Sequence, residues 1–488
     1  MTSAWIVAAV LGLPLAASAS LALAGARRIA PDLNAAFSLL TLGAALLLAQ
    51  RTLAHGAGFV FGHAFFVDPF NVLLVALTAF VGWTTALFSK PYMRTERDRG
   101  RMNASRMRLY HAMYPLFVFA MLLALLTNNL GVLWVAMEAA TLATVLLVSV
   151  YRTAAGFEAA WKYFIVCGVG IAQALFGTIL LYLAASRVPG GGGSDALLLS
   201  NLISARASLD PTIVSLAFVF LLIGYGTKVG LVPMHGWLPD AHAEGPTPIS
   251  AVLSGLLLNV ALYAVLRCKT LADGALHNGL PGRLLVGFGL VSVLVATCSL
   301  IRQTDAKRLL SFSSIEHMGM MTFAFGVGGP VATFAGLLHM TLHALVKSAL
   351  FFTVGHAAQK AGTQSIDGIR GLVRVSPMIG WAMVLGALAI LGLPPFGVFA
   401  SEFLILTSAM HALPWAAPLL TAALAVAFAV IFRRVQQMGF GDATARRLEH
   451  RPAWLPVFAH LAIALLLGLY IPHWLDAWYR AAGAVLAG

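Results

Sequence analysis

Charged residues are scarce in this chain. Of its 488 residues, 60% are hydrophobic and only 10% are Asp, Glu, Lys or Arg. Soluble domains usually carry about 25% charged residues. The composition therefore excludes a water-soluble enzyme and indicates a membrane protein with almost no soluble domain.

Cysteine is equally rare. The three cysteines, Cys167, Cys268 and Cys298, each lie in or beside an apolar run, and no two share a CxxC spacing. They cannot supply the four thiolates of an iron–sulfur cluster or a disulfide framework. The chain also lacks a Gly-rich phosphate loop and a nucleophile triad. We therefore expect no cofactor in this chain and no redox chemistry of its own.

Long apolar runs dominate what is present. A membrane-spanning helix needs about 20 apolar residues to cross a hydrocarbon core of about 30 Å. The first run has no basic stretch before it, so we expect a first span there and no cleaved signal. The runs lie at residues 3–25, 33–50, 69–88, 112–127, 130–150, 160–185, 212–231, 249–266, 284–301, 311–326, 331–355, 378–410, 415–432 and 457–472. The sequence predicts an all-α polytopic membrane protein of about 14 transmembrane helices.

Basic residues are distributed unevenly between the loops. With the N-terminus outside, 21 of the 31 Lys and Arg residues fall on one side of the membrane, 7 fall on the other, and 3 lie within spans. Loops rich in Lys and Arg stay in the cytoplasm. We expect a multi-pass protein of the cytoplasmic, or inner, membrane with its N-terminus outside. The formal net charge of +13 then reflects topology, and we expect no nucleic-acid partner.

Ionisable residues inside the spans are the candidate functional residues, because a charge at the bilayer centre costs roughly 3 kcal/mol on insertion scales. The candidates are Glu138, Lys228, His339, His343, Lys347 and Glu402. On a helix, the spacing of four places His339, His343 and Lys347 on one face. We expect this face to point toward Glu402. We also expect Glu138 and Lys228 to lie within about 10 Å of each other, because unpaired intramembrane charges are costly.

Structural interpretations compete with these functional ones. Glu138 and Lys228 could form a buried ion pair whose only role is to neutralise both charges. His339 and His343 could be hydrogen-bonded interior histidines. Their HxxxH spacing also suits a metal, but the sequence offers no evident third ligand, so we expect no metal site. The adjacent Glu316 and His317, near the end of a span, are open to either interpretation.

Two spans contain breaks next to ionisable residues. Pro233 follows Lys228 in the seventh span, and Pro394 and Pro395 precede Glu402 in the twelfth. Paired broken helices point to inverted repeats around an ion path. We expect two inverted five-helix repeats, and the predicted segments are residues 1–110 for helices 1–3, 111–270 for helices 4–8, 271–435 for helices 9–13 and 436–488 for the C-terminal helix.

The segment GTKVGLVPMHGWLPDAHAEGPTPISA, residues 226–251, resembles the signature of antiporter-like membrane subunits. This family is shared by respiratory complex I, multisubunit sodium/proton (Mrp) antiporters and membrane-bound hydrogenases. Residues 134–138, 303–308 and 313–317 and the His339 to Lys347 series extend the resemblance over roughly residues 110–410. The sequences SSIEHMG at 313–319 and LLLN at 256–259 are most similar to the hydrogenase-4 component F group.

The resemblance implies roles for the candidate residues. It implies that Glu138 and Lys228 couple neighbouring subunits, that Lys347 is the central lysine with His339 and His343 beside it, and that Glu402 lies at the outlet. The chain departs from the family at the eighth span. Many relatives have an ionisable residue there, and this chain offers Asn259 or Ser254.

The resemblance also implies a function and partners. We expect a proton-translocating subunit of a redox-driven complex that is NADH/quinone oxidoreductase-like or hydrogenase-4-like. Its partners would be other antiporter-like membrane subunits, a soluble redox arm and the lipid bilayer. Two alternatives are a Na+/H+ antiporter subunit and the membrane subunit of an inorganic-carbon uptake complex. Few intramembrane acids are available for sodium, which favours protons.

Overall fold

The computed structural model describes residues 3–189, 191–442 and 453–487. Helices α1 to α6 are Ser3–Ala24, Ala30–His55, Pro69–Asp98, Ala104–Leu126, Leu130–Val148 and Ala154–Ser186. Helices α7 to α11 are Leu199–Ala205, Pro211–Val229, Leu238–Glu244, Thr247–Val252 and Leu258–Leu276. Helices α12 to α15 are Leu280–Leu300, Ala306–Val327, Gly329–Ala361 and Leu372–Val375. Helices α16 to α20 are Pro377–Ile390, Gly397–Ala412, Ala416–Phe440, Trp454–Leu469 and His473–Ala487.

The expected all-α membrane fold is confirmed, whereas the expected count of 14 spans is not. Eleven described helices are long and apolar enough to cross a membrane, or twelve if α19 and α20, which meet at 87°, form one span. Helix α13 has 22 residues but carries several polar ones, and α16 and α17 have only 14 and 16 residues. The number of apolar spans is therefore lower than expected because polar residues interrupt one apolar run and a helix break divides another.

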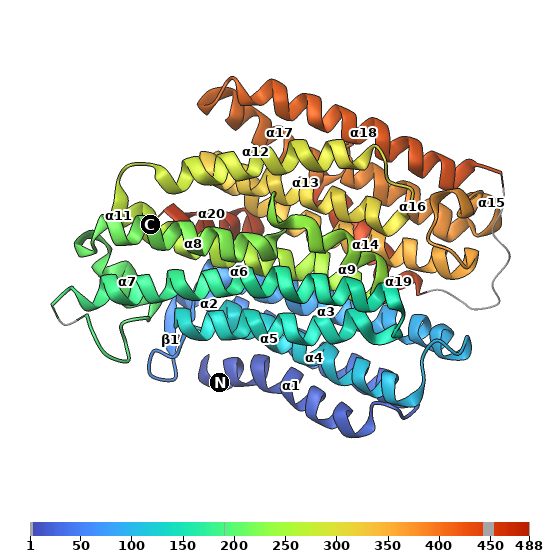
Figure 1. The fold of residues 1–488 in the computed structure, drawn as a ribbon, viewed down its shortest axis with the longest axis horizontal. Coiled ribbons are helices and arrows are strands. Elements are labelled where there is room, and N and C mark those ends of the chain that lie inside the picture. Colours follow the sequence, from blue (N-terminus) through green and yellow to red (C-terminus); the bar gives the residue numbers. More distant parts are fainter. Residues whose placement is uncertain (1–2, 190, 443–452, 488) are drawn as a thin grey trace.

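Most of the long helices lie side by side along the longest axis of the molecule (Figure 1). The N-terminus, α7 and the strand β1 (Gly58–Val60) lie toward one end, and α15 lies at the opposite end. β1 pairs with β2 (Phe65–Val67) in a small antiparallel hairpin between α2 and α3. This hairpin is the one sheet found in the described part of the chain, and the apolar runs gave no signal for it.

Polar side chains define where many helices begin. In each case the side chain before the first turn accepts a hydrogen bond from a backbone N–H that has no partner within the helix. These capping residues are Asp68, Asn103, Asn129, Thr153, Asp210 and Asp305. Asp68 and Asn71 cap reciprocally at the start of α3.

Asp68 also forms a buried ion pair with Arg267 of α11, with 2.5 Å between Asp68 Oδ2 and an Arg267 guanidinium nitrogen. Both side chains are almost completely buried, and the guanidinium lies over the rings of Phe70 and Tyr263. The sequence had placed Arg267 in an outer loop. That placement is wrong, because the pairing with Asp68 keeps the charge inside the last turns of the helix.

Both expected helix breaks are present. Helix α8 ends at Gly230, whose φ of +83° favours glycine, and the freed backbone N–H of Val232 donates to Ser292 Oγ at 3.0 Å. The second break separates α16 from α17. Gly392 there has φ of +63°, and a Cβ atom at this position would clash with Glu402 Oε2. Polar backbone at membrane depth thus has protein partners around it.

Three of the expected cytoplasmic basic residues, Arg446, Arg447 and Arg451, lie outside the described residues. Lys162, which was counted within a span, forms an ion pair with Asp240 of α9, and Asp240 also pairs with Arg308 at 2.5 Å. The proposed repeat boundaries, including the segment 436–488, stay a prediction.

Candidate functional site

Lys228 lies at the end of α8, fully buried, and donates a hydrogen bond to Thr141 Oγ1 of α5. The Thr141 side chain also lies beside the half-buried carboxylate of Glu138, one turn earlier on α5. Lys228 and Glu138 interact electrostatically, as their opposite charges require. In the described chain they form no direct ion pair. The purely structural ion pair that the sequence also allowed is therefore absent.

Lys347 is fully buried near the middle of α14. Its ammonium Nζ donates to the backbone carbonyl of Leu310, on α13, at 3.2 Å. Glu316 of α13 is also buried and is an electrostatic partner of Lys347. Helix α13 therefore supplies both a hydrogen-bond acceptor and an ionisable carboxyl group to the surroundings of the central lysine.

A pair of serines leads from the π-helical turn Leu253–Leu257 to the same carbonyl. Ser254 Oγ lies 2.8 Å from Ser314 Oγ, and Ser314 donates to the Leu310 carbonyl at 3.0 Å. Lys347 and Ser314 thus share one acceptor. Ser254 therefore connects the eighth span to the central lysine, although it cannot hold a charge.

The side chain of Asn259 joins two helices. Its amide donates to the backbone carbonyls of Gly255, at 3.2 Å, and Met340, at 3.1 Å, which ties α11 to α14. Thr341 on α14 accepts a hydrogen bond from Tyr479 of α20, which ties α14 to the C-terminal helix.

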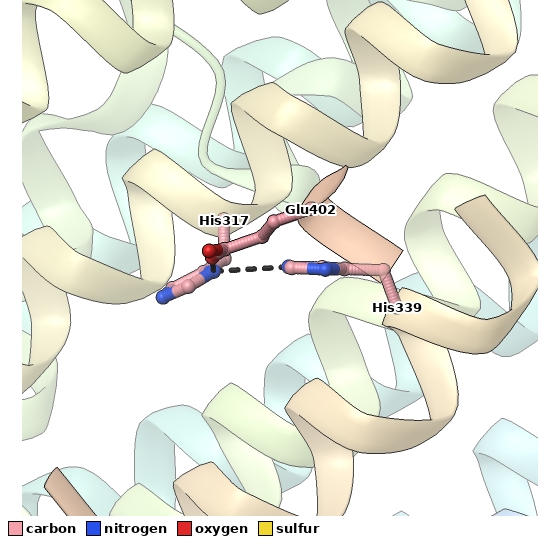
Figure 2. A group of neighbouring side chains, drawn as sticks. All are labelled: His317, His339 and Glu402. Carbon is pink, nitrogen blue, oxygen red and sulfur yellow. Dashed lines mark hydrogen bonds and ion pairs between the residues drawn. The ribbon is translucent and has the colours of Figure 1, made fainter. Parts of the chain in front are cut away.

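The densest polar cluster joins α13, α14 and α17. His317 Nδ1 lies 2.9 Å from His339 Nε2, and His339 Nδ1 lies 2.9 Å from Ser401 Oγ. Glu402 Oε1 lies 3.8 Å from His317 Nδ1. Figure 2 shows the two imidazole rings pointing toward one another, with the Glu402 carboxylate reaching the same nitrogen of His317 from a third helix.

The proton positions in this cluster follow from Ser401. Its hydroxyl donates to the Val398 carbonyl at 2.9 Å, so its oxygen accepts from His339 Nδ1–H. His339 Nε2 is then an acceptor, and His317 Nδ1–H donates to it. The opposite arrangement, with Ser401 donating to His339, reverses every bond in the row. Such a row can pass a proton in either direction.

His343 has another environment. Its ring centroid lies 5.8 Å from that of His317, and neither of its ring nitrogens has a partner among the residues that the structure describes. The expected shared stripe of His339, His343 and Lys347 is present on α14. Its connection to Glu402 runs through His317, a residue that the sequence left undecided.

The structure supplies a third potential metal ligand that the sequence did not show. The sequence showed no third ligand for the HxxxH pair, yet the structure brings potential ligand atoms of His317, His339 and Glu402 within 4.8 Å of one another. His343 is not among them. The reason is tertiary, since the three residues come from three helices.

Two further buried ionisable residues, which were not among the sequence candidates, lie near the α9 to α10 break. Lys307 is fully buried and donates to the carbonyls of Ala243, at 3.2 Å, and Gly245, at 2.7 Å. His242 is buried against the ring of Phe351, and its ring nitrogens have no partner in the described chain. Lys307 was counted as a loop residue. A signal was available, because the Asp305 cap places Lys307 inside a helix.

A family model described as NADH:quinone oxidoreductase/Mrp antiporter, TM matches residues 127–428, more than half of the chain. The chain belongs to this family. The matched segment contains every residue of the site described above, from Glu138 to Glu402.

The relatives that this chain resembles include a hydrogenase-4 component F homolog of Methylacidiphilum infernorum. It is 48% identical over 459 residues, which are 94% of this chain and 95% of the relative. The NADH-quinone oxidoreductase subunit N of Desulforudis audaxviator is 29% identical and covers 76% of this chain and 71% of the relative. The similarity to hydrogenase-4 component F expected from the sequence is confirmed.

Solved structures share the fold over nearly the whole chain. A chain of the archaeal membrane-bound sulfane sulfur reductase has a TM-score of 0.89 at 23% identity, with 99% of this chain and 98% of that chain covered. A chain of respiratory complex I from Thermus thermophilus has a TM-score of 0.81 at 24% identity, with 99% and 100% covered. Both belong to multi-subunit membrane complexes.

Proposed function

We propose that this chain is the proton-translocating membrane subunit of a redox-driven complex, NADH/quinone oxidoreductase-like or hydrogenase-4-like. Electron transfer in partner subunits would drive proton movement through its buried Glu, Lys and His residues. The partners would be other antiporter-like membrane subunits and a soluble redox arm. The names of the relatives support this assignment, and the chain itself supplies no redox cofactor in the proposal.

The hydrogen-bonded row His317, His339 and Ser401 carries the proposal. Histidine exchanges protons near neutral pH, and its two nitrogens let a proton arrive on one side of the ring and leave on the other. Because Ser401 can donate or accept, the row can reset after each proton. Glu402 lies 3.8 Å from His317 Nδ1, beside the contact between the two imidazoles, as a carboxylate that can take up or release a proton.

Lys347 would be the proton store that feeds this row. Its ammonium is held by one protein carbonyl and by the charge of Glu316. His343 lies one turn before Lys347 on α14, with its ring centroid 5.8 Å from that of His317. Neither ring nitrogen of His343 has a hydrogen-bond partner among the described residues. Water can bridge such buried polar groups at modest cost. We propose that protons pass from Lys347 through His343 to His317.

Lys228 and Glu138 would control this store from the other half of the chain. Since Thr141 lies between them, a movement of either side chain changes how strongly Glu138 stabilises the charged lysine. The serine pair Ser254 and Ser314 would carry protons across the eighth span with the help of water, in place of an ionisable residue.

Protons fit this chain better than sodium does. Sodium, a hard cation, prefers several oxygen ligands. Glu402 instead faces an imidazole nitrogen, and Glu138 lies beside a lysine and a threonine. We further propose that the N-terminus faces outside and that the end of the molecule containing α15 faces the cytoplasm. The reason is that most Lys and Arg residues fall in the loops that the sequence assigns to the cytoplasmic side.

Replacing Lys347 by methionine tests the proposal. In proteoliposomes of the assembled complex under turnover, Lys347→Met should abolish proton uptake while the complex still assembles. Lys269→Met is the matched control, because Lys269 pairs with Asp273 of its own helix, α11, and this variant should retain parent uptake. Normal pumping by Lys347→Met would contradict the proposal. Sodium uptake by the parent complex in place of protons would favour the antiporter alternative.

A further inference from the structure

Three potential metal ligands converge in the cluster of His317, His339 and Glu402 (Figure 2). His317 Nδ1 and His339 Nε2 are 2.9 Å apart, and Glu402 Oε1 lies 3.8 Å from His317 Nδ1. Ligand atoms about 2.0–2.1 Å from a tetrahedral zinc ion are about 3.3–3.5 Å from one another. The two distances at His317 differ from this range by only a few tenths of an ångström, and all three ligand atoms lie within 4.8 Å of one another. The Glu402 carboxylate would therefore move furthest to complete the site.

The chemistry of the three donors also fits zinc. Two imidazoles and one carboxylate form a known zinc ligand set that leaves a fourth position open. Hard cations such as Na+ and Mg2+ prefer oxygen ligands, so the two imidazoles select against them. The carboxylate neutralises one of the two positive charges of the ion, which matters in a buried site.

Ser401 prepares one of the ligands. A metal-binding histidine usually donates its other ring N–H to a neighbouring acceptor, which fixes the orientation of the ring. In the arrangement in which Ser401 donates to the Val398 carbonyl, His339 donates Nδ1–H to Ser401 Oγ, so the lone pair of His339 Nε2 faces the centre of the cluster. His317 needs only to move its proton from Nδ1 to Nε2, which leaves its charge unchanged.

Access is greatest on the Glu402 side. The side chains of Glu402 and His317 retain 11% and 4% exposure, whereas His339 is completely buried. An ion that reaches the cluster would thus meet the carboxylate first. Each ligand comes from a different helix, α13, α14 or α17, so a bound ion would tie the three helices together.

We propose that His317, His339 and Glu402 bind one Zn2+ ion, and that the bound ion stops proton movement along the row that they form. Zinc binding occupies the lone pairs of His317 Nδ1 and His339 Nε2, and these lone pairs must accept the moving proton. The second half of the proposal, inhibition, rests on the proposed function. The first half, binding, does not.

Binding is tested on the full-length chain purified in detergent. Zn2+ titration by calorimetry should show one tight site per chain, and Co2+ in its place should give the visible absorption of a tetrahedral site with nitrogen and oxygen ligands. His339→Gln and Glu402→Gln should each weaken binding at least tenfold. His460→Gln is the control, because His460 is equally buried but bonds Thr84 and the Leu345 carbonyl. Its affinity should equal that of the parent.

A variant that keeps all three ligands separates loss of binding from loss of folding. Ser401→Ala keeps all three ligands and should weaken binding measurably by freeing the ring of His339. Elution as a single species in size-exclusion chromatography checks the fold of every variant. Absence of tight binding by the parent, or equal affinity in His339→Gln and the parent, would overturn the site.

Inhibition is tested on proteoliposomes of the assembled complex. Zn2+ should suppress proton uptake, a chelator should restore it, and the partner enzyme should remain active when uncoupled. If Zn2+ binds at the cluster and uptake continues, the inhibition is refuted. If the metal-free complex shows no uptake at all, the proposed function fails while the binding result stands. If uptake is normal and no zinc binds at the cluster, the site fails while the proposed function stands.

Discussion

Replacing Ser401 by alanine should interrupt proton transfer without removing any titratable group. The Ser401 hydroxyl is the partner of His339 Nδ1 and donates to the Val398 carbonyl. The substitution leaves His339 Nδ1 completely buried with no hydroxyl to accept its proton. The row from His317 then ends at His339, and it can no longer reset through the serine.

The size of the effect follows from the lost hydrogen bond. An unsatisfied buried polar group costs about 1–3 kcal/mol, and this range corresponds to about a 5- to 150-fold change in an equilibrium. If the cost falls on the transfer step, proton flux through the assembled complex should decrease by a similar factor. Electron transfer in the uncoupled complex should stay at the parent rate.

The assay compares proton flux with electron-transfer rate in the same proteoliposomes. Ser408→Ala is the matched control, because Ser408 lies on the same helix and donates only to its own helix carbonyl, that of Leu404, at 2.7 Å. Ser401→Thr keeps a hydroxyl and should restore much of the flux. Parent-level flux in Ser401→Ala, with Ser408→Ala unchanged, would refute the reasoning.

Three further substitutions test other parts of the structure. Arg267→Met should lower stability by about 3–5 kcal/mol, because it leaves the buried Asp68 carboxylate unpaired; thermal unfolding in detergent measures this, and unchanged stability would argue against the pair. Gly392→Ala should displace the Glu402 carboxylate, besides about 1–2 kcal/mol of backbone strain, so flux should decrease in complexes that still assemble. Asn259→Lys should reduce the yield of assembled complex, since a lysine cannot reproduce both backbone hydrogen bonds of the amide; parent yield with increased flux would show that the eighth span accepts an ionisable group.

Much of the fold was predictable because apolar runs, proline breaks and basic loops each have a direct physical cause. The breaks after Lys228 and before Glu402 were correctly located from proline and glycine alone. The number of spans was not, because α13 carries Glu316 and His317 among its apolar residues and so resembles neither a clear span nor a loop. The buried position of Arg267 depends on Asp68, almost 200 residues away in the chain.

The site was only partly predictable. Spacing on a single helix placed His339, His343 and Lys347 correctly on one face, because helical periodicity is local. The contacts from His317 to His339 and from Ser401 to His339 join different helices, and no local pattern encodes them. The shared acceptor at the Leu310 carbonyl is a backbone group, so no residue type could have indicated it.

The close approach of Gly392 to Glu402 makes the α16 to α17 break a candidate hinge for gating. Proton transfer requires heavy atoms about 2.6–3.2 Å apart, and the 3.8 Å between Glu402 and His317 exceeds this range. A shift of roughly 0.6 Å would bring the pair within that distance. Because the Glu402 carboxylate lies directly against the backbone of the break, a small change of backbone angle there would move it toward or away from the histidine. The backbone dihedral angles at Gly392 would then control whether Glu402 and His317 are close enough for proton transfer.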